Sequence, residues 1–221
     1  MNFFVTKIVE DSDVTYNLTV AGYVALAAVM LVVFAAGCMF RDKKMDAKQI
    51  AFCAMAMALA VVTSMFKIID MPMGGSVTLF SMLFIVLTGY WFGVRTGITT
   101  AVAYGILQLL INPYIISIWQ MLMDYIFAFG ALGLAGLFSN KKKGLIKGYI
   151  AGILGRYFFS FLSGWIFFAV YTPDFFNSAI LYSLAYNGAY IGLEAAITLI
   201  VLALPPVNEA MQAVKKLVCE A

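Results

Sequence analysis

Three charged residues, Asp124, Arg156 and Glu194, stand inside long apolar stretches of the sequence. Charges within a bilayer are costly, so they tend to be paired or functional. Counted along each helix from its predicted outer end, Arg156 and Glu194 lie roughly 15 and 14 residues deep. This matching depth favours a buried structural ion pair between them. Asp124 lies roughly 10 residues deep, and the sequence leaves open whether it binds a cationic or amino-bearing ligand or is satisfied by hydroxyls or by Arg156.

Polar and aromatic residues recur at helical spacing around these charges, on three apolar stretches. The first stretch carries Ser117, Gln120 and Asp124 beside Tyr125, the second Ser160, Gly164, Phe168 and Tyr171, and the third Ser183, Asn187, Tyr190 and Glu194, with Tyr182 and Tyr186 near its edge. One such stripe more often packs helices together, and tyrosines also gather at membrane interfaces. Three stripes that face the same outer half indicate a cavity for a flat, polar molecule of aromatic size.

The composition places these stretches in a membrane. Of the 221 residues, 64% are apolar and 11% are charged, whereas soluble domains have about 45–50% and about 25%. This excludes a soluble globular domain, a disordered chain and a disulfide-rich secreted scaffold. The net charge of +3 is too small to indicate a nucleic-acid partner.

Cysteine and histidine usage argues against metal and redox chemistry. Cys38, Cys53 and Cys219 show no CxxC spacing, and the chain has no histidine. The cysteines therefore do not predict a zinc or dithiol centre, and His-based triads and histidine metal or haem ligation are excluded. We expect no metal and no cofactor.

Seven apolar blocks predict an all-α integral membrane protein. They lie near 17–40, 48–69, 79–94, 97–112, 114–138, 147–171 and 179–204. Blocks of about 20 residues are long enough to cross a bilayer. Turn signals separate several of them, at 72–75, 112–113 and 172–174, and Pro205-Pro206 closes the last.

The distribution of basic residues predicts the direction of the chain. If the spans alternate, eleven of the 14 lysines and arginines fall on one side: Arg41, Lys43, Lys44, Lys48, Arg95, Lys141, Lys142, Lys143, Lys147, Lys215 and Lys216. Cytoplasmic loops carry such an excess. We therefore expect the N-terminus outside, the C-terminus in the cytoplasm, and the loops at 70–78, 112–114 and 171–179 outside.

Small residues in the second block offer a helix-packing surface. Ala54 and Ala58 form one small-xxx-small pair, and Ala56 and Ala60 form another. Such pairs let a second helix approach closely, either inside the bundle or as a docking face for a partner membrane subunit. The sequence has no Walker A loop. A small bundle with an outward cavity and no motor indicates a binding subunit that depends on other proteins.

Several stretches resemble one family of membrane proteins. They are residues 71–77 (MPMGGSV), 120–125 (QMLMDY), 127–138 (FAFGALGLAGLF), 155–158 (GRYF) and 181–188 (LYSLAYNG). In order and spacing they resemble the thiamine-specific branch of the S components, the substrate-binding membrane subunits of energy-coupling-factor (ECF) transporters. The resemblance implies a six-helix substrate-binding membrane domain at 48–204. It leaves an extracellular segment at 1–16, an additional transmembrane helix at 17–40 and a cytoplasmic tail at 205–221.

The resemblance also implies a thiamine site and a set of partners. Asp124 matches the acidic position of the family's pocket, and its tyrosine and asparagine positions match Tyr114, Tyr125, Tyr182 and Asn187. A histidine and a tryptophan that stack on the ligand in the family are Ser160 and Phe168 here. These departures keep a thiamine precursor, such as its pyrimidine half, or another small heterocyclic vitamin as an alternative ligand.

The implied partners are a transmembrane coupling subunit and two ATPase subunits in the plasma membrane, with Ala54 and Ala58 on the docking face. Two other classes of function remain as alternatives. A small membrane enzyme acting on a lipid would use Asp124, Arg156 and Glu194 as acid–base groups, and a structural subunit would explain the ion pair alone. The sequence favours a non-enzyme, because it lacks histidine and paired acidic metal motifs.

Overall fold

The computed structural model describes residues 5–10, 13–22, 24, 28 and 45–220, so most of the predicted span at 17–40 lies outside the described residues. The strands are β1 (Val5–Glu10), β2 (Asp13–Leu18), β3 (Lys67–Asp70) and β4 (Ser76–Thr78). The helices are α2 (Ala47–Met65), α3 (Ser81–Phe92), α4 (Val94–Ile111), α5 (Ile118–Met121), α6 (Ala128–Gly130), α7 (Gly144–Phe167), α8 (Ala179–Ala203) and α9 (Pro205–Glu220). Short helical elements of other types are η1 (Pro72–Gly74), the π-helical η2 (Leu122–Phe127), η3 (Ala131–Phe138) and η4 (Ala169–Tyr171).

The described part of the chain contains five helical segments that are long and apolar enough to cross a bilayer. They are Ala47–Met65, Val94–Ile111, Ile118–Phe138, Gly144–Phe167 and Ala179–Ala203. The third of these joins α5, η2, α6 and η3 end to end. The apolar helix α3 has only 12 residues, most of them buried inside the bundle. The prediction of a helical, multi-pass membrane protein is confirmed.

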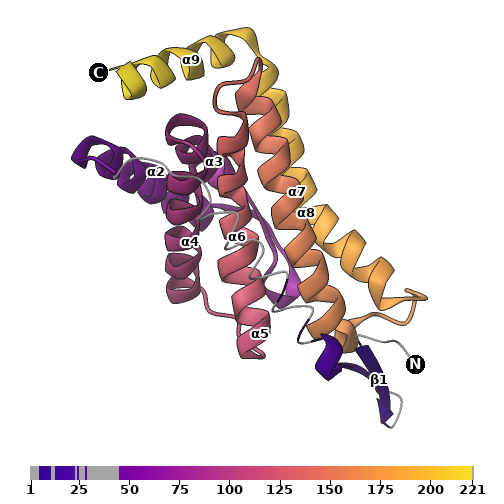
Figure 1. Ribbon diagram of the computed structural model, residues 1–221. Coiled ribbons are helices and arrows are strands. Elements are labelled where there is room, and N and C mark those ends of the chain that lie inside the picture. The colour runs from indigo at the N-terminus through magenta and orange to yellow at the C-terminus, as the bar shows by residue number, and fades with distance from the viewer. Residues whose placement is uncertain (1–4, 11–12, 23, 25–27, 29–44, 221) are drawn as a thin grey trace.

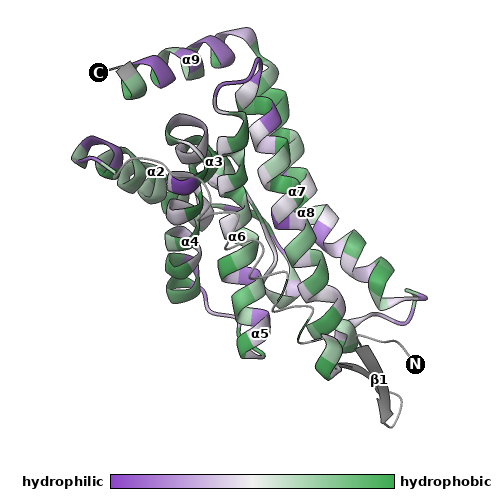
Figure 2. Ribbon diagram, viewed as in Figure 1, coloured by the Kyte–Doolittle hydropathy of each residue, from purple (hydrophilic) through white to green (hydrophobic). Residues whose placement is uncertain are grey.

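The membrane helices form a bundle whose two ends differ. In Figure 1, α4, the segment from α5 to η3, α7 and α8 run along one another. Helix α9 crosses one end of this bundle, which we call the α9 end, and the β1–β2 hairpin lies at the opposite end. Hydrophobic residues cover most of the bundle, whereas α9 alternates between hydrophilic and hydrophobic residues (Figure 2).

Glycines let the central segment η3 pack against helices on two sides. A Cβ on Gly148 of α7 would lie 2.8 Å from the Ala135 carbonyl oxygen, and one on Gly152 would lie 3.0 Å from that of Leu132. On the other side, Gly133 lies directly against the α4 backbone at Gly97. Small residues permit such close approach of membrane helices, so η3 forms the middle of the bundle.

The predicted block at 48–69 ends earlier than expected, at Met65. After it, β3 and β4 pair as an antiparallel hairpin, with a turn that places Met73 at φ 63° and Gly74 at φ 87°. The hairpin is held from outside by α8, because the Tyr186 hydroxyl accepts a hydrogen bond from the Gly75 N–H at 3.0 Å and donates one to the Pro72 carbonyl. The predicted apolar block therefore continues past Met65, whereas the helix ends there.

Glu194, on α8, caps the start of α3. Phe80 precedes α3 in a left-handed conformation and provides no side-chain cap. The Glu194 carboxylate instead accepts hydrogen bonds from the Thr78 hydroxyl at 2.6 Å, the Ser81 hydroxyl at 3.1 Å and the Met82 N–H at 3.1 Å. A negative charge at a helix N-terminus is stabilised by the unpaired N–H groups and the helix dipole.

The predicted ion pair between Arg156 and Glu194 is therefore wrong. Among the described residues, the salt bridge found is Lys67–Asp70, at 3.2 Å. The guanidinium of Arg156 instead lies 4.2 Å from the centre of the Phe129 ring, and its buried Nε has no hydrogen-bond partner. Two residues at one depth form an ion pair only if their helices turn them toward each other. Glu194 is turned toward α3 and Arg156 toward α6.

Replacing Glu194 by alanine should destabilise the fold, because Thr78, Ser81 and Met82 would lose a buried acceptor. An unsatisfied buried donor costs about 1–3 kcal/mol, so we expect a loss of about 3 kcal/mol in the free energy of unfolding. Thermal unfolding in detergent would show it as a lower midpoint. The matched control is Glu209→Ala on the exposed side of α9. Equal midpoints for the two variants would contradict the capping role.

Candidate functional site

A cavity of about 380 Å³ opens toward the end of the bundle opposite α9. Its walls come from the end of α2, the β3–β4 hairpin, the end of α4, the 112–117 loop, η2, α7 and α8. All seven side chains predicted to bind substrate line it: Tyr114, Asp124, Tyr125, Ser160, Phe168, Tyr182 and Asn187. The three stripes seen in the sequence thus converge on one cavity, while the role of each residue toward a ligand stays a prediction.

Asp124 is positioned by the buried side chain of Gln120. The Gln120 amide nitrogen donates to the Asp124 Oδ2 at 2.7 Å and to the Tyr114 carbonyl at 3.1 Å, and its Oε1 accepts from the Ile116 N–H at 3.0 Å. The Ser117 hydroxyl in turn caps the backbone of Gln120. Asp124 has no Lys or Arg nitrogen within 4 Å among the described residues. The carboxylate is therefore oriented by an amide rather than neutralised by a cation.

The helix around Asp124 is π-helical, over Leu122–Phe127. Single π turns within α-helices occur frequently at functional sites. Gly105, on α4, makes room for this wider turn, since a Cβ there would overlap the Tyr125 carbonyl oxygen. Asp124 and the adjacent Tyr125 both line the cavity as a result of this local geometry.

Aromatic rings form the mouth of the cavity, where the 112–117 loop meets α7. The rings of Tyr114 and Phe168 stack with their centres 5.8 Å apart and their planes 24° apart. The Tyr125 hydroxyl accepts from the Tyr114 N–H and donates to the Asn112 carbonyl, both at 2.9 Å. The polar end of Tyr125 therefore holds the loop, and its ring is the part available to line the cavity.

Helix α8 supplies a hydrogen-bonded polar wall. Asn187, which is buried, donates from Nδ2 to the Ser183 carbonyl at 2.9 Å and accepts at Oδ1 from the Tyr190 hydroxyl at 3.0 Å. Gly164, on α7, leaves the space that Ser183 and Asn187 occupy. Buried polar groups with satisfied partners keep a fixed orientation, so this wall is preorganised.

Two cavity residues that the sequence analysis did not assign to binding are of particular interest. Arg156, assigned to the ion pair, lines it, as does Tyr186, which anchors the β3–β4 hairpin. The spacing of Tyr182, Tyr186 and Tyr190 at successive i+4 positions was the available signal, and their rings lie 5.7–5.8 Å apart in a ladder along α8. No pattern in the sequence indicated whether Arg156 lines the cavity or forms a salt bridge with a carboxylate.

The two alanine pairs on α2 point in different directions and lie outside the cavity. Ala56 and Ala60 are buried against the bundle, whereas Ala54 and Ala58 are exposed. In the described part of the chain, no group of three His, Cys, Asp or Glu residues is arranged to hold a metal ion.

Comparison with known proteins identifies the family. The profile of the thiamine transporter protein family (Thia_YuaJ) matches residues 50–214. The chain is also 35% identical over 165 residues to the thiamine transporter ThiT of Bacillus subtilis (strain 168), a match that covers 68% of this chain and 84% of that protein. This chain belongs to the thiamine transporter family.

A solved structure supports the same fold. It is that of ThiT from Listeria monocytogenes, which matches with a TM-score of 0.59 at 24% sequence identity, over 72% of this chain and 94% of that one. The matched family segment begins in α2 and ends in α9, so it contains every element that lines the cavity. The β1–β2 hairpin lies outside it.

Substituting Gly105 by alanine should disturb the π turn that carries Asp124, because the added methyl group meets the Tyr125 carbonyl. Overpacking of this kind costs about 1–3 kcal/mol, and we expect a lower thermal unfolding midpoint. Gly192→Ala on α8 is the matched control, since a Cβ there meets no atom within 4 Å. A glycine-to-alanine change in an exposed helix is neutral or stabilising. Equal effects of the two substitutions would contradict a specific role for Gly105.

Proposed function

We propose that the chain is a thiamine-binding subunit of an ECF-type importer, with the 380 Å³ cavity as the vitamin site. The observation that carries the proposal is the oriented carboxylate of Asp124 in a cavity lined by aromatic rings and hydroxyls, in a chain of the thiamine transporter family. Thiamine bears an aminopyrimidine and a cationic thiazolium ring. A carboxylate favours such a ligand, and aromatic faces stack on its rings and attract the cation.

The cavity fits this ligand in size and in the character of its walls. Small-molecule sites measure about 300–1,000 Å³ and combine apolar walls with a few placed polar groups. Here the placed groups are Asp124 on one wall and Asn187 on the other, and Tyr114, Phe168 and Tyr182 supply aromatic surface. Because Gln120 and Tyr190 fix the two polar groups, little side-chain freedom would be lost on binding.

One feature favours a smaller ligand as the second candidate. Ser160 offers no ring to the cavity, and the Phe168 ring is already stacked against Tyr114. A ligand with two rings would find fewer stacking partners than the family pattern implies. The pyrimidine half of thiamine keeps the groups that Asp124 and Asn187 recognise.

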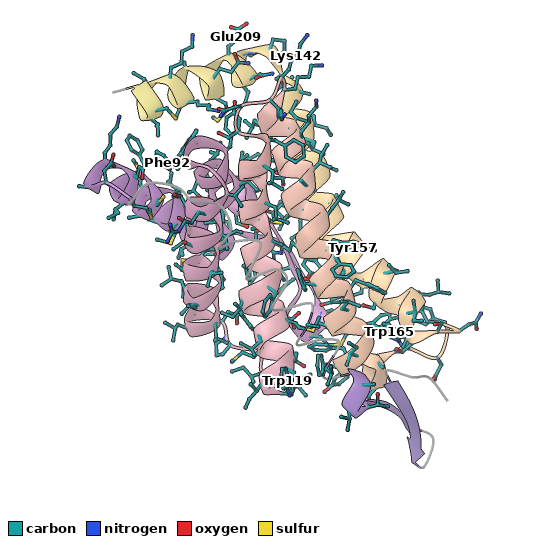
Figure 3. All side chains as sticks on the ribbon, in the orientation of Figure 1. Phe92, Trp119, Lys142, Tyr157, Trp165 and Glu209 are labelled. Atoms are coloured by element: carbon teal, nitrogen blue, oxygen red, sulfur yellow. The ribbon has the colours of Figure 1, made fainter. Side chains whose placement is uncertain are left out.

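Charge supports an outward-facing cavity. Lys141, Lys142, Lys143, Lys215 and Lys216 belong to the α9 end, whereas the cavity opens toward the other end. Figure 3 labels Lys142 and Glu209 at the α9 end and Trp119 and Trp165 at the opposite one. Because basic residues are retained on the cytoplasmic side, the proposed orientation places α9 in the cytoplasm and the cavity outside.

The proposed partners are a transmembrane coupling subunit and two ATPase subunits. The sequence has no Walker A loop of its own, so in an ATP-driven importer the ATP would be hydrolysed by separate subunits. Ala54 and Ala58 are exposed on a membrane helix, where small residues let a partner helix approach. We assign the coupling contact to this face of α2.

Asp124→Asn should weaken thiamine binding by roughly 10- to 100-fold, which corresponds to one charge-assisted hydrogen bond. Isothermal titration calorimetry of the detergent-purified chain measures the Kd directly. Asp174→Asn, in the exposed 172–178 loop, is the matched control and should bind as the unmodified chain does. Saturable binding of hydroxymethylpyrimidine without binding of thiamine would replace the first candidate ligand by the second. Binding of neither ligand by a folded sample would refute the proposal.

Ala58→Trp should abolish thiamine uptake by cells that also produce the coupling and ATPase subunits, while the Kd for thiamine stays unchanged. The indole would occupy the space that a partner helix needs. Ala196→Trp, at an exposed position of α8, controls for a bulky residue on a membrane helix and should leave uptake intact. Loss of binding together with uptake in Ala58→Trp would count against a docking role.

A further inference from the structure

A second cavity, of about 430 Å³, lies at the α9 end of the bundle. Its walls are the 141–146 segment, one face of α9, and the side chains of Tyr90 and Leu202. The 141–146 segment consists of the end of the η3–α7 connection and the first residues of α7. It shares no residue with the proposed thiamine site. We call it the basic cleft.

The charge of the basic cleft has one sign. Its walls contain five lysines and no Asp or Glu: Lys141, Lys142, Lys143, Lys215 and Lys216. None of these lysines lies within 4 Å of a carboxylate among the described residues. Five ammonium groups around one cavity repel one another, and an anion between them would relieve that repulsion.

The geometry of the cleft is set by α9. This helix contributes Asn208, Gln212, Lys215, Lys216 and Cys219, which recur at helical spacing and so share one face. Its neighbouring apolar face, which includes Val207 and Met211, packs on the core of the bundle. Because apolar contacts hold α9 across the end of the bundle (Figure 1), its polar face stays turned toward the 141–146 segment.

Lys215 connects α9 to the segment that follows η3. Its ammonium group donates to the carbonyl and hydroxyl oxygens of Ser139 and lies 4.1 Å from the centre of the Tyr90 ring. Burial lowers the pKa of Lys215. The side chains of Lys141, Lys142, Lys143 and Lys216 are exposed, so they are the ones free to reach an incoming anion.

A row of apolar side chains extends from the basic cleft along one face of α7, and we call it the apolar track. Ile146 lines the cleft, and Ile150 and Leu154 follow at i+4 and i+8 on the same face. These two side chains are 41% and 61% exposed, so they face the surroundings of the bundle rather than its core. On a membrane helix, such a face meets lipid acyl chains.

We infer that the basic cleft binds the phosphate headgroup of an anionic membrane phospholipid, whose acyl chains lie along Ile150 and Leu154. The lysines recognise the phosphate, as basic pockets at the cytoplasmic ends of membrane helices do. The apolar track selects a lipid over a soluble phosphate, because only a lipid uses both features. The site serves to fix α9 at the membrane surface, and it is independent of the ligand in the other cavity.

The test measures binding of short-chain phosphatidylglycerol to the detergent-purified full chain by native mass spectrometry. Phosphatidylcholine of the same chain length and glycerol phosphate serve as comparison probes. The variant Lys142→Gln/Lys216→Gln removes two cations from the cleft, and we expect its affinity for phosphatidylglycerol to fall roughly 30-fold. The control Arg95→Gln/Lys147→Gln removes the same charge from exposed positions outside the cleft and should keep the affinity.

Two further measurements make the result decisive. The conservative variant Lys142→Arg/Lys216→Arg should retain binding, and the thermal unfolding midpoint of each lipid-free variant reports whether the fold is intact. Equal loss in the cleft and control variants would overturn the inference, since attraction would then be general. It would equally be overturned by equal binding of phosphatidylcholine, or by glycerol phosphate displacing the lipid.

Discussion

A buried carboxylate on α8 determines where one wall of the 380 Å³ cavity begins. Glu194 accepts three hydrogen bonds from residues 78–82 and so supplies the cap that α3 cannot make from its own sequence. Two helical turns earlier on α8, Tyr186 holds the β3–β4 hairpin through Gly75 and Pro72. The segment from 72 to 82 is thereby attached to α8 at two points. Its position over the cavity depends on these tertiary contacts more than on local propensity.

The opposite wall depends on local geometry instead. Gln120 connects the Asp124 carboxylate to the backbone of the 114–116 loop, and Tyr125 ties the same loop to Asn112. The π turn at 122–127 gives both residues their place at the cavity, and Gly105 provides the space for it. One wall is therefore rigid through a short-range network and the other through contacts between distant segments. A cavity built in this way offers fixed polar groups to its ligand, which reduces the entropy lost on binding.

The sequence predicted the helical membrane fold because apolar length and turn signals are local properties. It also predicted the seven cavity residues, since helical spacing shows which side chains share a face and since the family pattern marks the positions. The sequence failed to predict the partners of Arg156 and Glu194. The position of a residue along the chain indicates its depth in the bundle, but the direction in which its side chain points depends on how the helices pack. The β3–β4 hairpin was missed for a similar reason, because Ile68 and Ile69 continue the apolar block of the preceding helix in the sequence. Residues 67–70 are held as a strand by pairing with residues 76–78. Helix α9 was taken for a tail because its polar and apolar residues alternate around a helix rather than forming an apolar block.

The displaced ion pair has a consequence for ligand charge. Had Arg156 paired with a carboxylate, it would have been neutralised; instead it lies over the face of Phe129, beside the cavity that also contains Asp124. Asp124 receives a hydrogen bond from a neutral amide and has no cation within 4 Å among the described residues. A charge with little access to water gains more from an opposite charge than from a dipole. At the proposed site, a ligand that brings its own cation or amino group would give Asp124 a partner that the neutral amide of Gln120 does not replace. The proposed selectivity for amino-bearing heterocycles rests on this arrangement, in which Asp124 and Arg156 line one cavity without forming a salt bridge.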